Sequence, residues 1–253
     1  MTKSPSVDVP NLASAFASSR LIDLTPVIRP HMPRWPTHPD VEILRGARTH
    51  EEHGYFAQTL VLPEHSGCHV DAPAHLVADG SGMSIDNFTL DALIGPAKKF
   101  DLSGEDLQPG EVLSLARFEV LAAKQGMPVA GDIVLFQFGW DEHFDREIAG
   151  EPGHQGWWGA NAPGLDDDVC RTLHEIGIRA VGSDTAGCDI AVRDGQIVSS
   201  PGHHTWFLPK GTPVVEGLYN LAAAPEAFFF MALPLKIDAG SGSPLRAVAL
   251  VPR

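Results

Sequence analysis

One eleven-residue segment constrains this chain more than any other feature. Residues 65–75 read HSGCHVDAPAH, so the three imidazoles of His65, His69 and His75 and the carboxylate of Asp71 lie within one short stretch. A lone histidine in a chain with 12 of them is ordinarily a surface or hydrogen-bonded core residue, but four candidate ligands in one segment are hard to place in that way. Neutral imidazole combined with carboxylate suits Zn²⁺, Mn²⁺ or Fe²⁺. We therefore expect the fold to present this segment to a divalent metal.

The local geometry of the segment supports that expectation. Side chains alternate along an extended strand, so His69 and Asp71 should project to the same side, and His65 should share it. Ser66 and Gly67 leave room for the backbone to bend around an ion. His75 follows two residues after Pro73, which stiffens the exit from the segment.

Composition and charge exclude several classes of partner. The 253 residues include 18 Lys and Arg against 32 Asp and Glu, for a formal net charge of -14. An acidic chain gains nothing from counterion release on nucleic acid and is repelled by an anionic membrane surface. We expect neither nucleic acid nor membrane as a partner, and a small molecule as the substrate.

The cysteines and the apolar runs indicate a cytoplasmic protein. The three cysteines are odd in number and widely spaced, which is typical of a reducing compartment rather than a disulfide framework. We expect no signal peptide at the N-terminus, and no apolar run approaches the eighteen residues of a membrane span.

The pattern along the chain predicts a single mixed α/β domain with more strand than helix. Residues 1–19 are rich in Ser, Ala and Pro and are expected to form a flexible arm, and residues 20–253 form the domain. Two helices are expected, at 166–176 and at 111–124, closed by Gly177 and Gly126. Apolar, β-rich runs bounded by Gly and Pro predict strands at 21–28, 56–62, 97–102, 133–138, 178–181, 228–235 and 247–251.

The stretch 139–164 shows no periodicity and is expected to be irregular. A segment of this length in a compact domain is either a surface excursion or a functional loop. In the second case Trp157 and Trp158 would belong to a lid or a subunit contact.

With these residues, the chain resembles the metal-dependent cyclase-like hydrolases, the family of bacterial kynurenine formamidase, isatin hydrolase and trans-dienelactone hydrolase. The signature is the run 65–75, and weaker motifs follow in the expected order along most of the chain. They are LIDLT at 21–25, RWP at 34–36, IGPA at 94–97, GDIVL at 131–135, VGSDT at 181–185, His204 with Glu216, PLK at 234–236 and GSPLRA at 242–247.

The resemblance implies roles for these residues and a strand-rich, β-barrel-like core with flanking helices. His65, His69, Asp71, His204 and Glu216 would be metal ligands. His75 would be the acid/base residue, and Trp35 would line the substrate pocket. His204 is chosen over its neighbour His203 because the family places a Glu twelve residues after the histidine. Glu216 permits one or two ions, either Mn²⁺ or Zn²⁺.

Cys68 is a departure, because the family usually has Thr at this position. Its plainest interpretation is a small packed side chain, and the alternative is a redox-sensitive or metal-adjacent thiolate. The length of the 139–164 region is a second departure, and it weakens any transfer of substrate from the small formamidases.

The chemistry and the resemblance together predict hydrolysis of an amide, a cyclic amide or imide, or a lactone by a metal-activated water. The substrate would be small and planar or aromatic, such as an aryl formamide or an isatin-like compound. The alternative is a non-haem Fe(II) oxygenase that uses His69, Asp71 and His204. A metal-binding protein without catalytic activity is the third interpretation. The resemblance also implies a homodimer or homotetramer, with contacts at residues 1–19 and 139–164.

Overall fold

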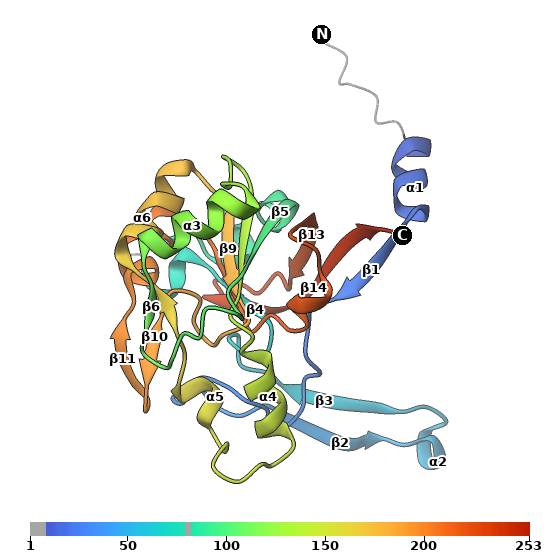
Figure 1. The fold of residues 1–253 in the computed structure, drawn as a ribbon. Helices are drawn as coiled ribbons and strands as arrows, with labels where there is room; N and C mark the ends of the chain where they lie inside the picture. The colour runs from blue at the N-terminus through green and yellow to red at the C-terminus, as the bar shows by residue number, and fades with distance from the viewer. Residues whose placement is uncertain (1–8, 79–81) are drawn as a thin grey trace.

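Eight strands form one mixed sheet, and seven of them close into a barrel (Figure 1). The structure is a computed structural model that describes residues 9–78 and 82–253. The strand order is β1–β14–β13–β5–β7–β9–β12–β4, and β14 also pairs with β4, which closes the ring. The strands are β1 (Ser19–Asp23), β4 (His69–Asp71), β5 (Ile94–Asp101), β7 (Ile133–Gln137), β9 (Ala180–Ser183), β12 (Val214–Glu216), β13 (Ala227–Pro234) and β14 (Gly242–Pro252).

Alternation along the strands separates two cores. In β7, Ile133 and Leu135 face the barrel interior, whereas Val134 and Phe136 belong to the cluster beneath the helices. Every residue of β7 is buried, and its neighbours β5 and β9 run parallel to it. A parallel strand covered on both faces must be apolar throughout, which explains why this run was predicted from the sequence. The predicted α/β barrel-like fold is confirmed.

Helices α3 (Leu115–Gln125) and α6 (Asp167–Ile176) lie together on one side of the barrel (Figure 1). The predicted helix at 166–176 is confirmed, with the Asp166 side chain capping its first turn and Gly177 in the left-handed conformation at its end. The helix predicted at 111–124 begins later, at Leu115. Residues Val112–Leu113 form strand β6 instead, which pairs with β8 (Gly164–Leu165).

The expectation that residues 139–164 are irregular is wrong. The segment contains helix α4 (Asp141–Ile148) and the short helix α5 (Trp157–Ala160). The Glu147 carboxylate accepts a hydrogen bond from the backbone N–H of Trp158, and the Trp158 side chain is buried in the outer core. Trp158 is therefore a core residue rather than part of a lid.

Two segments project from the barrel (Figure 1). Residues 1–8 of the predicted arm lie outside the described residues, and Val9–Ala17 form helix α1. The second projection is a hairpin of β2 (Glu42–Arg48) and β3 (Ala57–Val61), with α2 (His50–His53) at its tip. The run 56–62 thus forms a strand as predicted, but in a separate hairpin.

The remaining described elements are short. They are the β10 (Ala191–Arg193) and β11 (Gln196–Ser199) hairpin, a π-helical turn, η4 (Gly202–Trp206), and the 3-10 turns η1 (Pro73–His75), η2 (Ile85–Asn87), η3 (Leu90–Leu93), η5 (Leu208–Lys210) and η6 (Leu221–Ala223). No helix among the described residues has the length and apolar character needed to cross a bilayer.

Candidate active site

The site begins with two paired strands on the barrel wall. In β4, Val70 packs inside the barrel, so His69 and Asp71 point outward together, as the alternation predicts. Strand β12 runs antiparallel to β4 and places Glu216 opposite His69. Nε2 of His69 lies 3.4 Å from an Asp71 oxygen and 3.5 Å from a Glu216 oxygen. Two buried carboxylates therefore face the same imidazole.

His65 reaches the same place from the turn before β4. Its Nδ1 lies 2.6 Å from Oδ1 of Asp71, and its ring meets that of His69 edge-on. Gly67 allows the approach because it adopts φ 62, a left-handed conformation that disfavours a side chain. The predicted grouping of His65, His69 and Asp71 is observed.

The placement of His204 at the site is wrong, and His203 occupies the position. Nε2 of His203 lies 3.4 Å from Asp71 and 3.2 Å from Glu216, whereas His204 is exposed and bonds Ser200. The cause is local, since Asp189 accepts the backbone N–H groups of Gly202 and His203 and also binds the His203 ring. The twelve-residue spacing to Glu216 selected the wrong neighbour. The oxygenase triad of His69, Asp71 and His204 is likewise not formed.

His75 and Trp35 line the pocket above these groups. The pocket has a volume of about 170 Å³ and is walled on its apolar side by Leu76, Ile190 and Ile197. Nε2 of His75 lies 3.8 Å from Asp71, and its ring lies 4.2 Å from that of His65. Both residues therefore lie where the resemblance implied.

Charge is distributed unevenly across the pocket. Burial alone would raise the pKa of Asp71, but hydrogen bonds from His203, His65 and His69 hold it well below its usual range. Burial opposes protonation of His69, yet Asp71 and Glu216 raise its pKa to about 10. The base of the pocket thus attracts positive charge. His75, in contrast, has a pKa lowered by burial, which favours its neutral form.

The donor set fits a divalent metal. His69 and His203 each commit Nδ1 to a protein oxygen, of Gly67 and Asp189 respectively, which leaves Nε2 facing the carboxylates. This arrangement is usual for metal-binding histidines, whose second nitrogen is held by an outer partner. Two groups of potential ligands result, one of His65, His69 and Asp71 and the other of Asp71, His203 and Glu216. Asp71 is common to both.

Several site residues escaped prediction from the sequence. Asp189 precedes His203 by fourteen positions and has no motif around it, and His38 reaches the pocket from the loop after Trp35. The adjacent pair at 203 and 204 was the only signal for His203. Cys68 is fully buried, and burial raises the pKa of its thiol, so the structure supports the packed interpretation over a thiolate.

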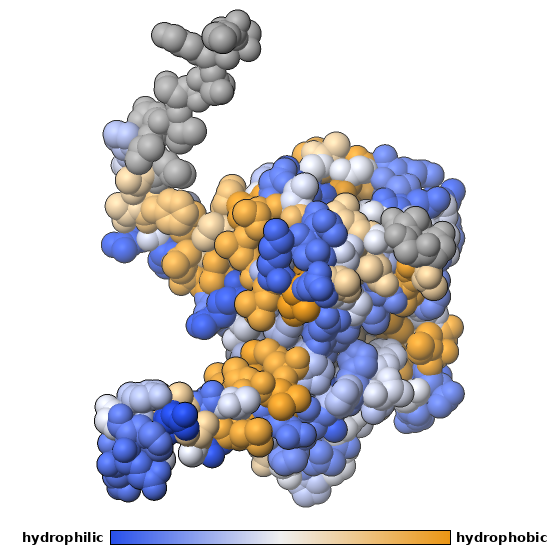
Figure 2. Space-filling model, turned by 180° about the vertical axis from the view of Figure 1, so that it is seen from behind, coloured by the Kyte–Doolittle hydropathy of each residue, from blue (hydrophilic) through white to orange (hydrophobic). Residues whose placement is uncertain are grey.

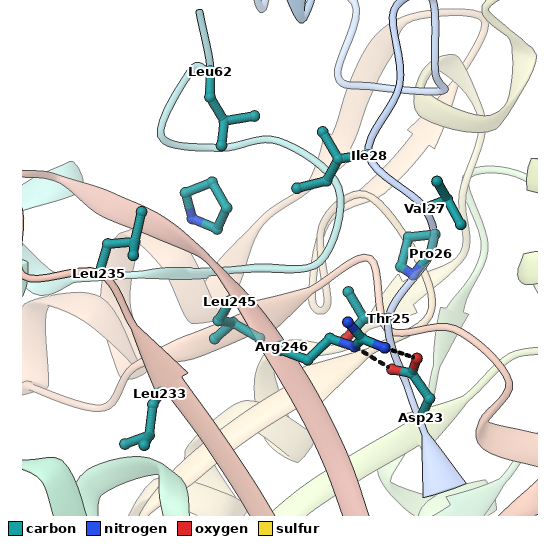
Figure 3. A pocket seen from close by; sticks show the side chains of 11 residues that line it. Asp23, Thr25, Pro26, Val27, Ile28, Leu62, Leu233, Leu235, Leu245 and Arg246 are labelled. Carbon is teal, nitrogen blue, oxygen red and sulfur yellow. Dashed lines mark hydrogen bonds and ion pairs between the residues drawn. The ribbon is translucent and has the colours of Figure 1, made fainter. Parts of the chain in front are cut away.

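A larger cavity of about 550 Å³ lies elsewhere, between the base of the β2–β3 hairpin and strands β1, β13 and β14 (Figure 3). Its walls are mostly apolar, and the charged pair Asp23 and Arg246 closes one side. No histidine is among the described residues that line it. The chemistry is therefore concentrated in the smaller pocket.

Known proteins share this sequence and fold. Residues 22–190 match the family described as "Putative cyclase". Isatin hydrolase of Roseibium aggregatum is 31% identical over 245 residues, 92% of each chain, and kynurenine formamidase of Salinibacter ruber is 29% identical, with 90% of this chain and 96% of the relative covered. An isatin hydrolase solved with the product analogue thioisatinate superposes with a TM-score of 0.85 at 27% identity, covering 99% of this chain and all of the other.

The family match covers well over half of the chain, and the relatives cover nearly all of it. The match includes His65, His69, Asp71 and His75, and the full-length relatives extend it past His203 and Glu216. The chain belongs to the cyclase-like family of metal-dependent hydrolases.

Proposed function

We propose that the protein is a metal-dependent hydrolase that opens the C–N bond of a small planar amide, either an aryl formamide or a cyclic amide of the isatin type. A lactone is the related ester possibility. The observation that carries the proposal is the convergence of His65, His69, Asp71, His203 and Glu216 beneath one pocket, with His75 at its wall. The names of the similar proteins, isatin hydrolase and kynurenine formamidase, support the same bond type.

A bound divalent ion would supply Lewis acidity and lower the pKa of water from roughly 15.7 to about 7. His65, His69, His203 and the two carboxylates would hold that ion, since their nitrogen and oxygen atoms face one another. Burial lowers the pKa of His75, which favours the neutral form of its ring. Its ring can therefore take a proton from water at the pocket floor and return it to the leaving nitrogen.

The pocket walls favour a flat substrate. Trp35 and Ile197 come from different segments, and Leu76, Ala186 and Ile190 complete the apolar part of the lining. A planar ring can pack against such walls while its carbonyl faces the ligand cluster. The loop that contains Trp35 and the β10–β11 hairpin that contains Ile197 would thus accept planar substrates and exclude bulkier ones.

The number and identity of the ions form a separate proposal. Asp71 takes part in both groups of potential ligands, and Glu216 approaches both His69 and His203. This arrangement supports two ions, of which one would be held by His65, His69 and Asp71 and the other by Asp71, His203 and Glu216, and a single ion shared by fewer ligands is the other outcome. The set of nitrogen and oxygen donors suits Zn²⁺ and Mn²⁺.

The proposal is tested with chelator-stripped protein reconstituted separately with Mn²⁺, Zn²⁺ and Fe²⁺. Absorbance would follow hydrolysis of N-formylkynurenine, isatin, a dienelactone and a cyclic imide. We expect metal-dependent turnover of the formamide or of isatin, with bound metal counted by elemental analysis. A protein that holds its metal but hydrolyses none of the four would overturn the proposed reaction.

We also propose that the protein works as a homodimer or homotetramer. Apolar surface lies on both sides of the hollow between the two projections (Figure 2). The exposed apolar side chains of the protein include Leu44 and Leu60 of the hairpin, Val27 after β1 and Leu235 after β13. Patches of this kind on a protein surface commonly mark contacts between subunits.

The three cysteines are free and buried, which is consistent with the cytoplasmic location expected from the sequence.

A further inference from the structure

Residues 240–242, a glycine–serine–glycine segment, connect the group of potential metal ligands to the carboxylate of Glu64. The hydroxyl of Ser241 donates to Oε2 of Glu64 at 2.6 Å, and the backbone N–H of Ser241 donates to the same oxygen at 3.0 Å. On its other side, the Ser241 hydroxyl oxygen lies 2.8 Å from Nε2 of His65. Glu64, Ser241 and His65 thus form one continuous chain of hydrogen bonds.

The direction of these bonds fixes the tautomer of His65. A carboxylate only accepts, so the hydroxyl proton of Ser241 is committed to Glu64. The hydroxyl oxygen can then only accept from His65, which requires the proton of that ring to lie on Nε2. In the neutral ring, Nδ1 is then left with its lone pair, directed at Oδ1 of Asp71 at 2.6 Å. Two acceptors this close need a positive group between them, either a second proton on the ring or a metal ion that takes its place.

The two glycines make this arrangement possible. A Cβ on Gly240 would lie 2.8 Å from Oε1 of Glu64, and a Cβ on Gly242 would lie 2.7 Å from Cε1 of His65. The carbonyl of Ser241 accepts the backbone N–H of Ala72, which directly follows β4. Side chains at positions 240 and 242 would push Glu64 and His65 away from Ser241. The two glycines therefore allow Ser241 to contact both residues.

We propose that Glu64 and Ser241 are positioning residues that hold His65 with Nδ1 toward the metal. This inference rests on the proposed metal site and adds a prediction about its geometry. His65 binds through Nδ1, whereas His69 and His203 bind through Nε2, because their Nδ1 atoms are held by Gly67 and Asp189. Partners of this kind commonly change metal affinity by about 10–100-fold.

The first experiment measures Zn²⁺ affinity by competition with a chelating dye. We expect Ser241→Ala to weaken binding by about 10–100-fold, and Ser241→Thr, which keeps the hydroxyl, to restore much of the loss. The matched control is Ser103→Ala, because Ser103 also donates to a carboxylate at 2.6 Å but lies in an exposed turn. Equal affinity in wild type and Ser241→Ala would overturn the inference.

A double-mutant cycle tests whether Glu64 affects metal binding through Ser241 or independently of it. Glu64→Gln keeps the size of the side chain but no longer compels the hydroxyl of Ser241 to accept from His65. It should weaken binding in the wild type and change nothing further in the Ser241→Ala background. If the losses of metal affinity in the two single variants add up in the double variant, Glu64 does not act through Ser241.

Nuclear magnetic resonance of ¹¹³Cd-loaded protein with ¹⁵N-labelled histidine reads the geometry directly. We expect coupling from cadmium to Nδ1 of His65 and to Nε2 of His69 and His203. Coupling to Nε2 of His65, or a wild type that binds no metal, would refute the inference. Neither readout uses substrate, so a protein that binds metal in this way but hydrolyses nothing would overturn only the proposed function.

Discussion

His203 and His204 are adjacent in the chain but lie in opposite environments. Gly202 and His203 are buried because Asp189 binds both of their backbone N–H groups, and a Cβ on Gly202 would lie 2.3 Å from the ring of Phe207. The next residue of the π-helical turn faces solvent. A packed glycine, rather than the spacing to Glu216, decides which imidazole reaches the cluster.

The pair provides a matched test of the site. His203→Asn should weaken metal binding by more than roughly 100-fold, since losing a ligand exceeds the effect of losing an outer partner. His204→Asn should leave metal affinity, turnover and melting temperature unchanged. Dye competition and a thermal melt on both variants provide the comparison. A larger loss of metal in the His204 variant would reverse the assignment.

His75 should matter for turnover more than for metal. We expect His75→Ala to lower kcat by about 10²–10⁴-fold, the usual contribution of a general acid or base. Its Nε2 is 3.8 Å from Asp71 and is not one of the mutually close ligand groups, so the metal content should be retained. Steady-state kinetics and elemental analysis of the same sample test both statements. Near-normal kcat would remove His75 from the proposed mechanism.

Residues that lie together in the chain could be predicted, and those joined only by the fold could not. His65, His69 and Asp71 share one strand and its preceding turn, so local alternation was enough to group them. Asp189 and Ser241 reach the cluster through turns whose geometry depends on packing against distant segments. Glycines on both sides of Ser241 were the one sequence feature that could have pointed to it.

At the scale of elements, a buried carboxylate organises the segment that sequence patterns failed to describe. Asp184, just after β9, accepts hydrogen bonds from the backbone N–H groups of Phe138, Gly139 and Trp140. These groups lie immediately before α4, so the start of the helix is held by a residue more than forty positions later. Periodicity within residues 139–164 cannot reveal a partner at that distance, which is why the helix was missed.

Removing this carboxylate should destabilise the protein. Asp184→Ala leaves three donors without their partner, and two of them, in Phe138 and Trp140, are buried. Each unsatisfied buried group costs about 1–3 kcal/mol, so we expect the free energy of unfolding, from urea titration, to fall by at least about 2 kcal/mol. Asp101→Ala is the control, because its bonds to Ser103 lie in an exposed turn. Equal stability in the two variants would contradict the role given to Asp184.

The same carboxylate gives stability a pH dependence. Burial, reinforced by Asp141, raises the pKa of Asp184 from 3.8 to about 7. The native state then holds the proton more tightly than the unfolded state, so this contribution is complete below pH 3.8 and is lost as the pH rises toward 7. The stability advantage of wild type over Asp184→Asn should therefore shrink between pH 5 and pH 8. An advantage that grows over this range would show that the pKa is not raised.

Strands could be predicted where burial on both faces makes them apolar throughout, as in β7, or where apolar and β-branched residues dominate, as in β13. The hairpin β10–β11 was missed because it is short and partly polar. Strand β12 was missed because its three residues include a charged one, Glu216. Functional side chains placed on strands weaken the pattern by which those strands are recognised.

At the scale of the molecule, the two projections distinguish this chain from a plain barrel. The hairpin exposes about half of the Leu44 and Leu60 side chains, at 51% each, and the loop after β1 exposes 66% of Val27. The contacts between subunits expected at residues 1–19 and 139–164 remain a prediction. The exposed leucines make the hairpin a further candidate for such a contact.

Light scattering of purified protein tests the assembly. We expect a mass at least twice the 27.1 kDa of the chain, and we expect Leu60→Lys to reduce it by placing a charge in an apolar contact. Val120→Lys is the control, because Val120 is similarly exposed, at 56%, but lies on α3. A wild-type mass of one chain would remove the proposed oligomer.

Strand β14 joins parts of the chain that are synthesised far apart in time. Its first residues pair with β4, its middle with β13 and its last with β1, and no described strand follows it. Contacts between such distant segments form slowly because the intervening loop must close first. A nascent chain that has emerged from the ribosome only through β13 has all its imidazoles but lacks Ser241 and the strand that closes the ring. The geometry that we propose for His65 is therefore complete only after Ser241 is in place and β14 has paired with β4.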